Sequence, residues 1–203
     1  LEWDDYTPEI RLEVLDLLVA VHTAPPEVRD RARPEDHAIQ FRENLAGGRA
    51  DPGLGPYARP AAELLHAHLP EIRRAVARHD DLAGLARAEG NGPVLTHGEP
   101  HPGNAMRTGD GLVLIDWDTA LAAPPERDLW HLDPGDGSVH AAYTAATGTV
   151  PRPEVVELYR LRWDLTEIAQ AVARFREPHG GTADDDETLA NLEESITNVA
   201  AAR

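Results

Sequence analysis

Residues 96–104 read Thr-His-Gly-Glu-Pro-His-Pro-Gly-Asn, and an apolar run that starts at Leu112 ends in Asp116-Trp117-Asp118. Glu99 and Asn104 are five residues apart, and Asp116 follows twelve residues after Asn104, at the end of an expected strand. A hairpin would bring these three side chains together. Two carboxylates and an amide oxygen form an all-oxygen donor set of the kind that Mg²⁺ takes, and Mg²⁺ sites hold the ion through one or two carboxylates plus substrate phosphates. The spacing therefore favours phosphoryl transfer.

Apolar periodicity around this stretch predicts a mainly α fold with a small β hairpin. Short apolar runs predict strands at 93–96 and 112–115, which we expect to pair as a hairpin around the loop. Residues 24–60 are rich in Pro, Gly, Arg and Asp and, apart from an amphipathic piece at 38–45, predict irregular structure that adds nothing to the core. Helical spacing predicts helices at 8–22, 60–69, 71–79, 126–132, 139–146, 153–176 and 184–201, the last of them capped by its acidic start at 184–187.

The loop and the strand after it resemble known enzymes. The pattern His-x-acid-x-x-x-x-Asn, followed by an apolar strand that ends in Asp, resembles the catalytic loop and the metal-binding Asp of protein-kinase-like enzymes. It is similar to the aminoglycoside phosphotransferase family in particular, which shows His-Gly-Asp-x-His-x-x-Asn and then Ile-Asp-Trp. The resemblance implies that Asn104 and Asp116 bind Mg²⁺. It also implies that Glu99 orients and deprotonates the attacking hydroxyl, that His97 braces the loop, and that Asp128 holds the loop by hydrogen bonds.

The resemblance is close over residues 94–132 and extends to the flanking helices only in general layout. It implies that residues 1–203 form a single lobe, the helical C-terminal lobe of a protein-kinase-like α+β fold. Residues 94–132 would carry the catalytic loop and the metal segment, and the helices over 138–203 would line the substrate side. The implied cofactors are Mg²⁺ and ATP or GTP as the phosphoryl donor.

Two departures from the family pattern stand out. Position 99 carries Glu where the family has Asp, which moves the carboxylate by about one bond length, although a loop shaped around Glu still positions a hydroxyl. The chain contains no lysine, and its glycines at 47–48, 53 and 55 lie in a proline-rich context rather than between strands. We therefore expect that the N-terminal nucleotide lobe is absent, that the chain begins at the hinge of a longer kinase, and that it is inactive alone.

Charge indicates the class of ligand. The chain has 36 acidic and 19 basic residues, and every one of those basic residues is Arg, so the formal net charge is −17. Such a balance disfavours nucleic acid as a partner and favours a cationic small molecule. Asp164 and Glu167 lie three residues apart on one face of a predicted helix, and they are candidate ligands for substrate ammonium groups; a solvated helix face is the alternative.

Several classes of site are excluded or disfavoured. The chain has no cysteine, which excludes disulfides and thiolate metal sites. No apolar run approaches the roughly 20 residues of a membrane-spanning helix, and no secretory signal opens the chain, so we expect a cytoplasmic protein without a membrane partner. His97 and His101 have the spacing of a helical zinc pair, but the Gly and Pro residues between and after them disfavour a helix.

These observations together predict an ATP-dependent phosphotransferase that acts on a hydroxyl of a small, cationic, aminoglycoside-like molecule. A choline-type or sugar-type acceptor stays open, because the catalytic pattern recognises phosphate and metal rather than the acceptor. The alternative from another class is a catalytically silent kinase-like module that binds a cationic small molecule, and Glu99 in place of Asp favours that alternative. The sequence does not indicate an oligomeric state.

Overall fold

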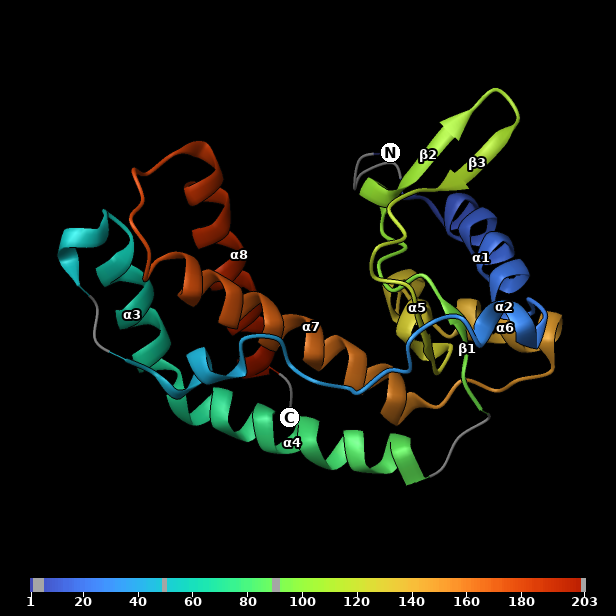
Figure 1. The fold of residues 1–203 in the computed structure, drawn as a ribbon, viewed down its shortest axis with the longest axis horizontal. Helices are drawn as coiled ribbons and strands as arrows, with labels where there is room; N and C mark the ends of the chain where they lie inside the picture. The colour runs from blue at the N-terminus through green and yellow to red at the C-terminus, as the bar shows by residue number, and fades with distance from the viewer. Residues whose placement is uncertain (2–5, 49–50, 89–91, 202–203) are drawn as a thin grey trace. The chain divides into compact units, whose positions relative to one another are not determined.

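The structure is a computed structural model, and it describes residues 1, 6–48, 51–88 and 92–201. The chain forms two compact units, whose helices and strands are labelled in Figure 1. The first unit contains residues 1–36 and 85–159, and the second contains residues 37–84 and 160–203. Within the described residues, no helix combines the length and the apolar composition needed to cross a lipid bilayer.

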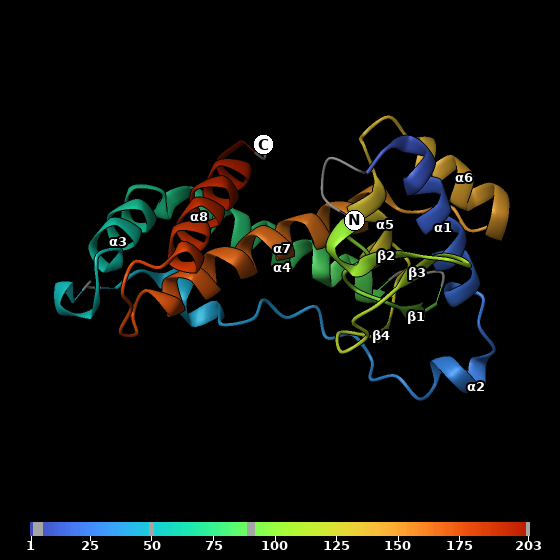
Figure 2. The ribbon, with the colours of Figure 1, turned by 90° about the horizontal axis from the view of Figure 1, so that it is seen from above.

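In the first unit, α1 packs against β1 and β3 of two small antiparallel sheets and also against α6, beside which it lies in Figure 2. Its elements in chain order are α1 (Pro8–His22), α2 (Pro26–Arg29), β1 (Val94–Thr96), η4 (Pro102–Asn104), β2 (Ala105–Thr108), β3 (Gly111–Leu114), β4 (Leu121–Ala123), α5 (Glu126–Leu132), α6 (Ser138–Thr147) and the start of α7 (Pro153–Arg174). The predicted helices at 8–22 and 126–132 are confirmed, and those predicted at 139–146 and 153–176 differ from α6 and α7 only at their ends.

The predicted pairing of the two strands was wrong. β1 pairs with β4, in a register that sets Val94 opposite Ala123, while β3 pairs with β2 and sets Leu114 opposite Ala105. The turn at residues 109–110 joins β2 directly to β3, so the tightest connection available to β3 is to its neighbour in sequence. β2 has three exposed residues and β4 is three residues long, so neither carries the apolar run by which a strand is recognised from sequence.

The core of the first unit is built around α1. The buried face of α1 contributes Val14, Leu15 and Leu18, because these positions recur at helical spacing. They pack in one cluster with side chains of α5, α6 and the β2–β3 hairpin, namely Leu129, Leu132, Val139, Tyr143, Ala105 and Leu112. Helix α1 begins where the sequence predicts, with Thr7 accepting a hydrogen bond from the backbone N–H of Ile10 at its N-terminus.

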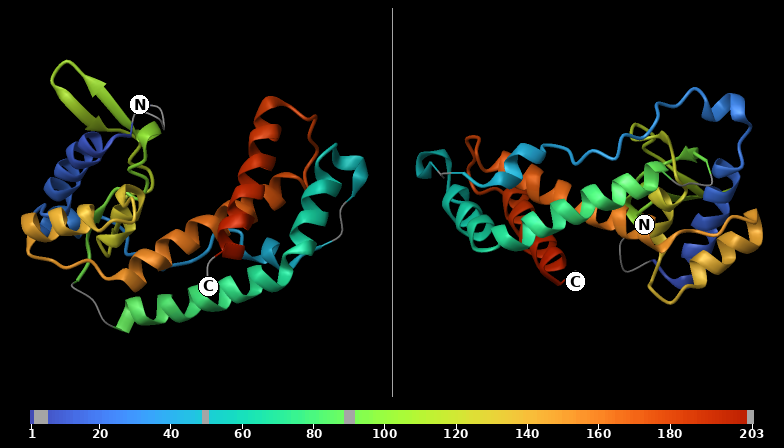
Figure 3. Two further views of the ribbon diagram at one scale, coloured as in Figure 1. Left: turned by 180° about the vertical axis from the view of Figure 1, so that it is seen from behind. Right: turned by 90° about the horizontal axis from the view of Figure 1, so that it is seen from below.

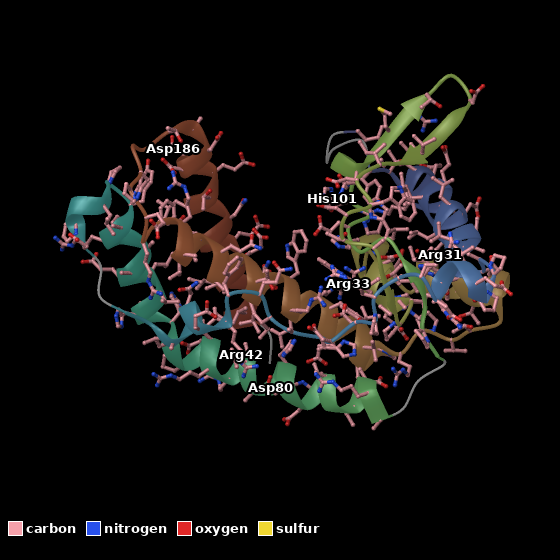
Figure 4. The ribbon with its side chains drawn as sticks, viewed as in Figure 1. Arg31, Arg33, Arg42, Asp80, His101 and Asp186 are labelled. Carbon is pink, nitrogen blue, oxygen red and sulfur yellow. The ribbon has the colours of Figure 1, made fainter. Side chains whose placement is uncertain are left out.

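The second unit is helical throughout its described elements. They are η2 (Arg42–Ala46), η3 (Pro52–Leu54), α3 (Ala58–Ala67), most of α4 (Leu69–Ala88), the rest of α7 and α8 (Ala183–Ala201). α3 packs beside α8, as both views of Figure 3 show. As predicted, α3 and α4 are separate helices, but the break between them falls at His68 and Pro70 is the second residue of α4. α4 also continues well beyond the expected end at residue 79. On the surface of the second unit, Arg42 makes a bidentate ion pair with Asp80 of α4 (Figure 4).

The region over residues 24–60 contributes more than the sequence indicates. Ile39 and Leu45 are buried in the core of the second unit, beside Leu65, Leu165 and Phe175. The expectation that this region adds nothing to a core was therefore wrong. Both buried residues fall within the amphipathic piece at 38–45, and the short 3₁₀ helix η2 is enough to direct Leu45 inward.

The acidic start of α8 caps the helix through one of its carboxylates. Oδ2 of Asp185 accepts hydrogen bonds from the backbone N–H groups of Gly181 and Thr182, both at 3.0 Å. In return, Oγ1 of Thr182 accepts one from the backbone N–H of Asp185. This reciprocal arrangement is a capping box, and Arg174 of α7 lies 2.7 Å from the other carboxylate oxygen. The predicted cap over 184–187 is thus carried by Asp185.

We expect Asp185→Ala to lower the free energy of unfolding by about 1–2 kcal/mol, because it leaves two N–H groups at the start of α8 without an acceptor. Urea denaturation followed by circular dichroism would measure the change. Asp184→Ala is the matched control, since Asp184 is exposed, and we expect it to change the same quantity by less than about 0.5 kcal/mol. Equal losses in the two variants would contradict the capping role of Asp185.

Candidate functional site

His97 connects the loop after β1 to the strand that precedes Asp116. Its side chain is fully buried, and its Nε2 lies 2.9 Å from the carbonyl oxygen of Ile115, to which it donates. Its Nδ1 accepts a hydrogen bond from the backbone N–H of Glu99 at 3.3 Å. Both ring nitrogens are thus engaged by protein groups in one neutral tautomer, which leaves neither for a zinc ion. The ring of Trp117 covers His97 edge-on, with the centroids 4.6 Å apart.

Asp128 of α5 holds the same loop through hydrogen bonds to its backbone. Its fully buried carboxylate accepts hydrogen bonds from the backbone N–H groups of His97, at 2.8 Å, and Gly98, at 2.6 Å. His22 of α1 lies 2.9 Å from the same carboxylate and contacts the hydroxyl of Tyr143 through its other ring nitrogen. Burial acts to raise the pKa of Asp128. The hydrogen bond and the charge of His22, together with the charge of Arg127, outweigh this effect, so the pKa of Asp128 lies below its ordinary value.

Glu99 follows two residues after His97 and is half-buried. Burial raises the pKa of its carboxyl group; Arg127 acts in the opposite direction, and the charges of Asp118 and Asp116 add to the increase. A carboxylate whose pKa moves toward neutrality is a better proton acceptor than an exposed one, provided that it stays ionised at the working pH. Glu99 is therefore close enough to Asp116 and Asp118 to interact with their charges, and it is chemically suited to receive a proton.

Asn104 and Asp116 are brought side by side by the β2–β3 hairpin. The backbone N–H of Ile115 donates to the carbonyl of Asn104 at 2.9 Å, so that Asn104 lies opposite the residue before Asp116. The amide nitrogen of Asn104 donates to the carbonyl of Glu99 at 2.9 Å, which leaves its amide oxygen available as a ligand. Asp116 is exposed and has a φ of 63°, a left-handed conformation that is costly for a residue other than glycine and that clusters at functional sites.

The donor set of Asn104 and Asp116 fits Mg²⁺ better than a metal that needs a complete protein cage. Among the described residues there is no group of three or more His, Cys, Asp or Glu side chains arranged to hold a metal ion. Mg²⁺ does not require one, because it commonly takes one or two protein oxygens and completes its shell with phosphates and water. The residues present therefore fit a magnesium ion that is bound together with a nucleotide.

The sequence did not indicate two further side chains that shape the loop. Tyr6 donates a hydrogen bond from its hydroxyl to the carbonyl of Pro100 at 2.8 Å, and burial raises the pKa of that hydroxyl. His131 lies 3.2 Å from the carbonyl of Gly98 through Nε2, and burial lowers the pKa of its ring to about 3, so that it stays neutral. His101, labelled in Figure 4, has its ring 6.1 Å from that of His131. Tyr6 and His131 were missed because each is an isolated polar residue in the sequence and belongs to no recognisable motif.

Asp164 and Glu167 belong to the second unit, whereas the loop residues belong to the first. Asp164 accepts a hydrogen bond from the amide of Asn198 at 3.1 Å. Burial raises the pKa of Asp164 to about 6, and the charges of Glu194 and Glu167 add to the increase. The two residues therefore share a patch of concentrated negative charge on α7 and α8. Their role as ligands for substrate ammonium groups stays a prediction.

Comparison with known proteins identifies a family and a relative that this chain resembles in sequence. Residues 4–170 match the model of a family described as the phosphotransferase enzyme family. Protein StrN of Streptomyces griseus is 40% identical over 194 residues, which cover 86% of this chain and 56% of that protein. The chain thus spans little more than half the length of that relative.

Solved structures show the same fold at low sequence identity. A spectinomycin phosphotransferase, APH(9)-Ia, in complex with ADP and spectinomycin, superposes with a TM-score of 0.72 at 18% identity, over 98% of this chain and 66% of that one. An ethanolamine kinase of Plasmodium vivax superposes with a TM-score of 0.54 at 12% identity, over 95% of this chain and 60% of that one. The predicted fold class, a partial kinase-like lobe that is mainly helical with small sheets, is confirmed.

The raised pKa of Asp164 predicts how stability depends on pH. Between about pH 4 and pH 6 the folded state binds the proton of Asp164 more tightly than the unfolded state, so stability falls as the pH rises through this window. Asp164→Asn mimics the protonated acid, and we expect it to raise the free energy of unfolding by about 1–2 kcal/mol near pH 8 and to change it little near pH 4.

Urea denaturation of both proteins at the two pH values would measure this difference. Glu193→Gln is the matched control, because it removes one negative charge from an exposed position on the same helix pair. A stabilisation by Asp164→Asn that is equal at both pH values, or equal to that of the control, would contradict the assignment.

Proposed function

Because the chain belongs to the phosphotransferase enzyme family, we propose that its protein transfers the γ-phosphoryl group of ATP or GTP to a hydroxyl of a small, cationic molecule. The chain spans 56% of Protein StrN and 66% of the spectinomycin phosphotransferase, so the proposed activity is that of the whole protein. The observation that carries the proposal is that the amide of Asn104 donates to the carbonyl of Glu99, while the β2–β3 hairpin sets Asn104 opposite the residue before Asp116.

Glu99 is the proposed proton acceptor. In the transfer step, the oxygen of the acceptor hydroxyl forms a bond to the γ-phosphorus, the bond from that phosphorus to the bridging oxygen of the β-phosphate breaks, and the hydroxyl proton moves to the carboxylate of Glu99. Phosphoryl transfer depends more on positioning than on strong base catalysis, so the longer side chain of Glu is compatible with turnover. The raised pKa of Glu99 supports this role.

Asn104 and Asp116 are the proposed magnesium ligands, through the amide oxygen and the carboxylate. When bound, the ion would neutralise and orient the phosphate groups of the donor. The chain's own residues keep these two ligands in place: the β2–β3 hairpin aligns their backbones, and His97 joins the loop to the carbonyl of Ile115. Asp128 fixes the backbone from which Glu99 projects, through the N–H groups of His97 and Gly98.

An adenine nucleotide is the favoured donor, since two solved relatives of this fold are spectinomycin phosphotransferase complexes with ADP or AMP. GTP stays an alternative. The acceptor is proposed to carry amines because the chain has a net charge of −17, with Asp164, Glu167 and Glu194 gathered on two helices of the second unit.

Two alternatives have specific support. A small alcohol is favoured as the acceptor by the likeness to an ethanolamine kinase. A catalytically silent module that binds a cationic small molecule is favoured by Glu99, where the family pattern has Asp. Turnover by the full-length natural protein, measured with ATP and GTP over a panel of aminoglycosides, amino alcohols and sugars, separates these possibilities. No transfer to any acceptor would favour the silent module.

We expect Asp116→Ala to lower kcat of the full-length protein by at least about 10²-fold, and Glu99→Gln by about 10²- to 10⁴-fold, because the first removes a metal ligand and the second a proton acceptor. Steady-state kinetics with coupled detection of the nucleoside diphosphate would measure both. The matched control is Asp110→Ala, which removes an exposed carboxylate from the turn of the same hairpin and should leave kcat within about twofold. Turnover near the wild-type rate in Asp116→Ala would remove the metal assignment, and the same result in Glu99→Gln would remove the base.

The proposed amine recognition predicts a salt dependence. Attraction between exposed charges is screened over about 8 Å at physiological ionic strength, so the KM of an aminoglycoside should rise steeply with added NaCl while that of a neutral polyol changes little. Asp164→Asn combined with Glu167→Gln should raise the KM of the aminoglycoside more than it lowers kcat. Asp184→Asn combined with Glu193→Gln removes the same charge from exposed positions and is the control. An equal response of both acceptors to salt would show that the acidic balance serves solubility alone.

A further inference from the structure

Arg127 of α5 is a buried cation in contact with both segments of the candidate site. Its residue is only 4% exposed, although the arginine is charged at every physiological pH. Nη1 donates to the hydroxyl of Thr96 at 2.9 Å, and Nη2 donates to the carbonyl of Thr119 at 2.8 Å. Nε lies 3.1 Å from the carboxylate of Glu35. One planar guanidinium group therefore touches three chain segments that are distant in sequence.

The two threonines flank the proposed catalytic residues. Thr96 is the last residue of β1, three positions before Glu99, and Thr119 is three positions after Asp116. The same guanidinium therefore fixes the entry of the catalytic loop and the exit of the metal segment relative to each other. Thr119 adds a second connection, because its hydroxyl donates to the carbonyl of His97 at 2.9 Å.

Gly98 shows how closely the loop backbone packs on this group. Its φ is 104°, and a Cβ atom added there would lie 2.4 Å from both terminal nitrogens of Arg127. No side chain fits between the loop and the guanidinium, so any movement of Arg127 is transmitted to the backbone from which Glu99 projects. This contact concerns the Cα of Gly98, whereas Asp128 contacts its N–H, so the two side chains hold the loop from different directions.

Glu35 supplies the counterion from a proline-rich segment. The segment pairs with β4: the N–H of Ala122 donates to the carbonyl of Arg33 at 2.8 Å, and the N–H of Glu35 donates to the carbonyl of Ala122 at 3.0 Å. The carboxylate of Glu35 is as well buried as the guanidinium, with side-chain exposures of 4% and 5%. A buried charge is tolerated only when it is paired, so the pair behaves as one unit.

We propose that Arg127, with Glu35 as its counterion, is a positioning residue that fixes the separation between Glu99 and Asp116 for phosphoryl transfer. The proposal rests on the proposed function, because it concerns the geometry of the same reaction. Asp116 needs such support, since its left-handed backbone conformation persists only where its surroundings hold it. A lysine at position 127 would keep the charge but would lack the planar fork that reaches Thr96 and Thr119 together.

The kinetic test uses Arg127→Met, Arg127→Lys and Glu35→Gln in the full-length protein. Misplacement of reacting groups by about 1 Å costs about 10²-fold in rate, so we expect a kcat loss of that order for Arg127→Met and about 10-fold losses for the other two. The KM values of donor and acceptor should change by less than about threefold, because neither substrate contacts position 127 in this proposal. Arg107→Met is the matched control, since Arg107 lies half-exposed on β2, and it should behave as wild type.

Backbone amide hydrogen exchange tests the same proposal without turnover. In Arg127→Met and in Glu35→Gln, exchange should increase together at residues 96–99 and 117–121, while the amides of α8 stay unchanged. This measurement keeps the two proposals apart: if the wild-type protein transfers no phosphate, the proposed function fails, and the exchange pattern still decides whether Arg127 joins the segments.

Coupled increases in exchange together with a selective loss of kcat would support the positioning role. Wild-type kcat in a folded Arg127→Met variant would overturn it. So would a loss of kcat that is fully restored by Arg127→Lys, since that result would show that only the charge matters. If Arg127→Met fails to fold, Glu35→Gln and Arg127→Lys carry the test, and wild-type kcat and exchange in both would overturn the proposal.

Discussion

The buried carboxylate of Asp128 is the interaction on which the rest of the candidate site depends. Two backbone N–H groups of the loop point at it, and His22 contacts it from α1. A buried charge is stable only when hydrogen bonds satisfy it, so the loop, α1 and α5 must assemble in one arrangement to satisfy this one. The carboxylate thereby converts a Gly- and Pro-containing loop, which has many conformations available to it, into one with a defined backbone.

Repeating patterns made most helices predictable from the sequence, and their absence explains what was missed. Helix α1 and helix α5 have the predicted bounds, because apolar positions recur every three or four residues and prolines mark the starts. The strand pairing was not predictable, since β2 and β4 are short and largely polar or small, and a chain of alternating apolar residues is what identifies a strand. Pairing also runs through backbone atoms, which are the same for almost every residue.

The candidate site likewise has one part that the sequence predicted and one part that it did not. The spacing of Glu99, Asn104 and Asp116 predicted that the three residues lie together, although through a hairpin of 93–96 with 112–115 that does not form. The β2–β3 hairpin sets Asn104 opposite Ile115 instead. The contact between Arg127 and Glu35 had no such signal: one partner lies in a segment without periodicity, and their meeting depends on the pairing of that segment with β4. Long-range charge pairs of this kind become visible only once the topology is known.

The pairing of residues 33–35 with β4 also limits how related genes can exchange segments. A crossover anywhere between codons 36 and 126 would take Glu35 from one parent and Arg127 from the other. If the first parent encodes an uncharged residue at position 35, the hybrid inherits a buried guanidinium whose Nε has lost its carboxylate partner, although each parent is well formed. Natural shuffling and laboratory recombination should therefore keep these two codons together, so that the stretch from 35 to 127 is inherited as one block.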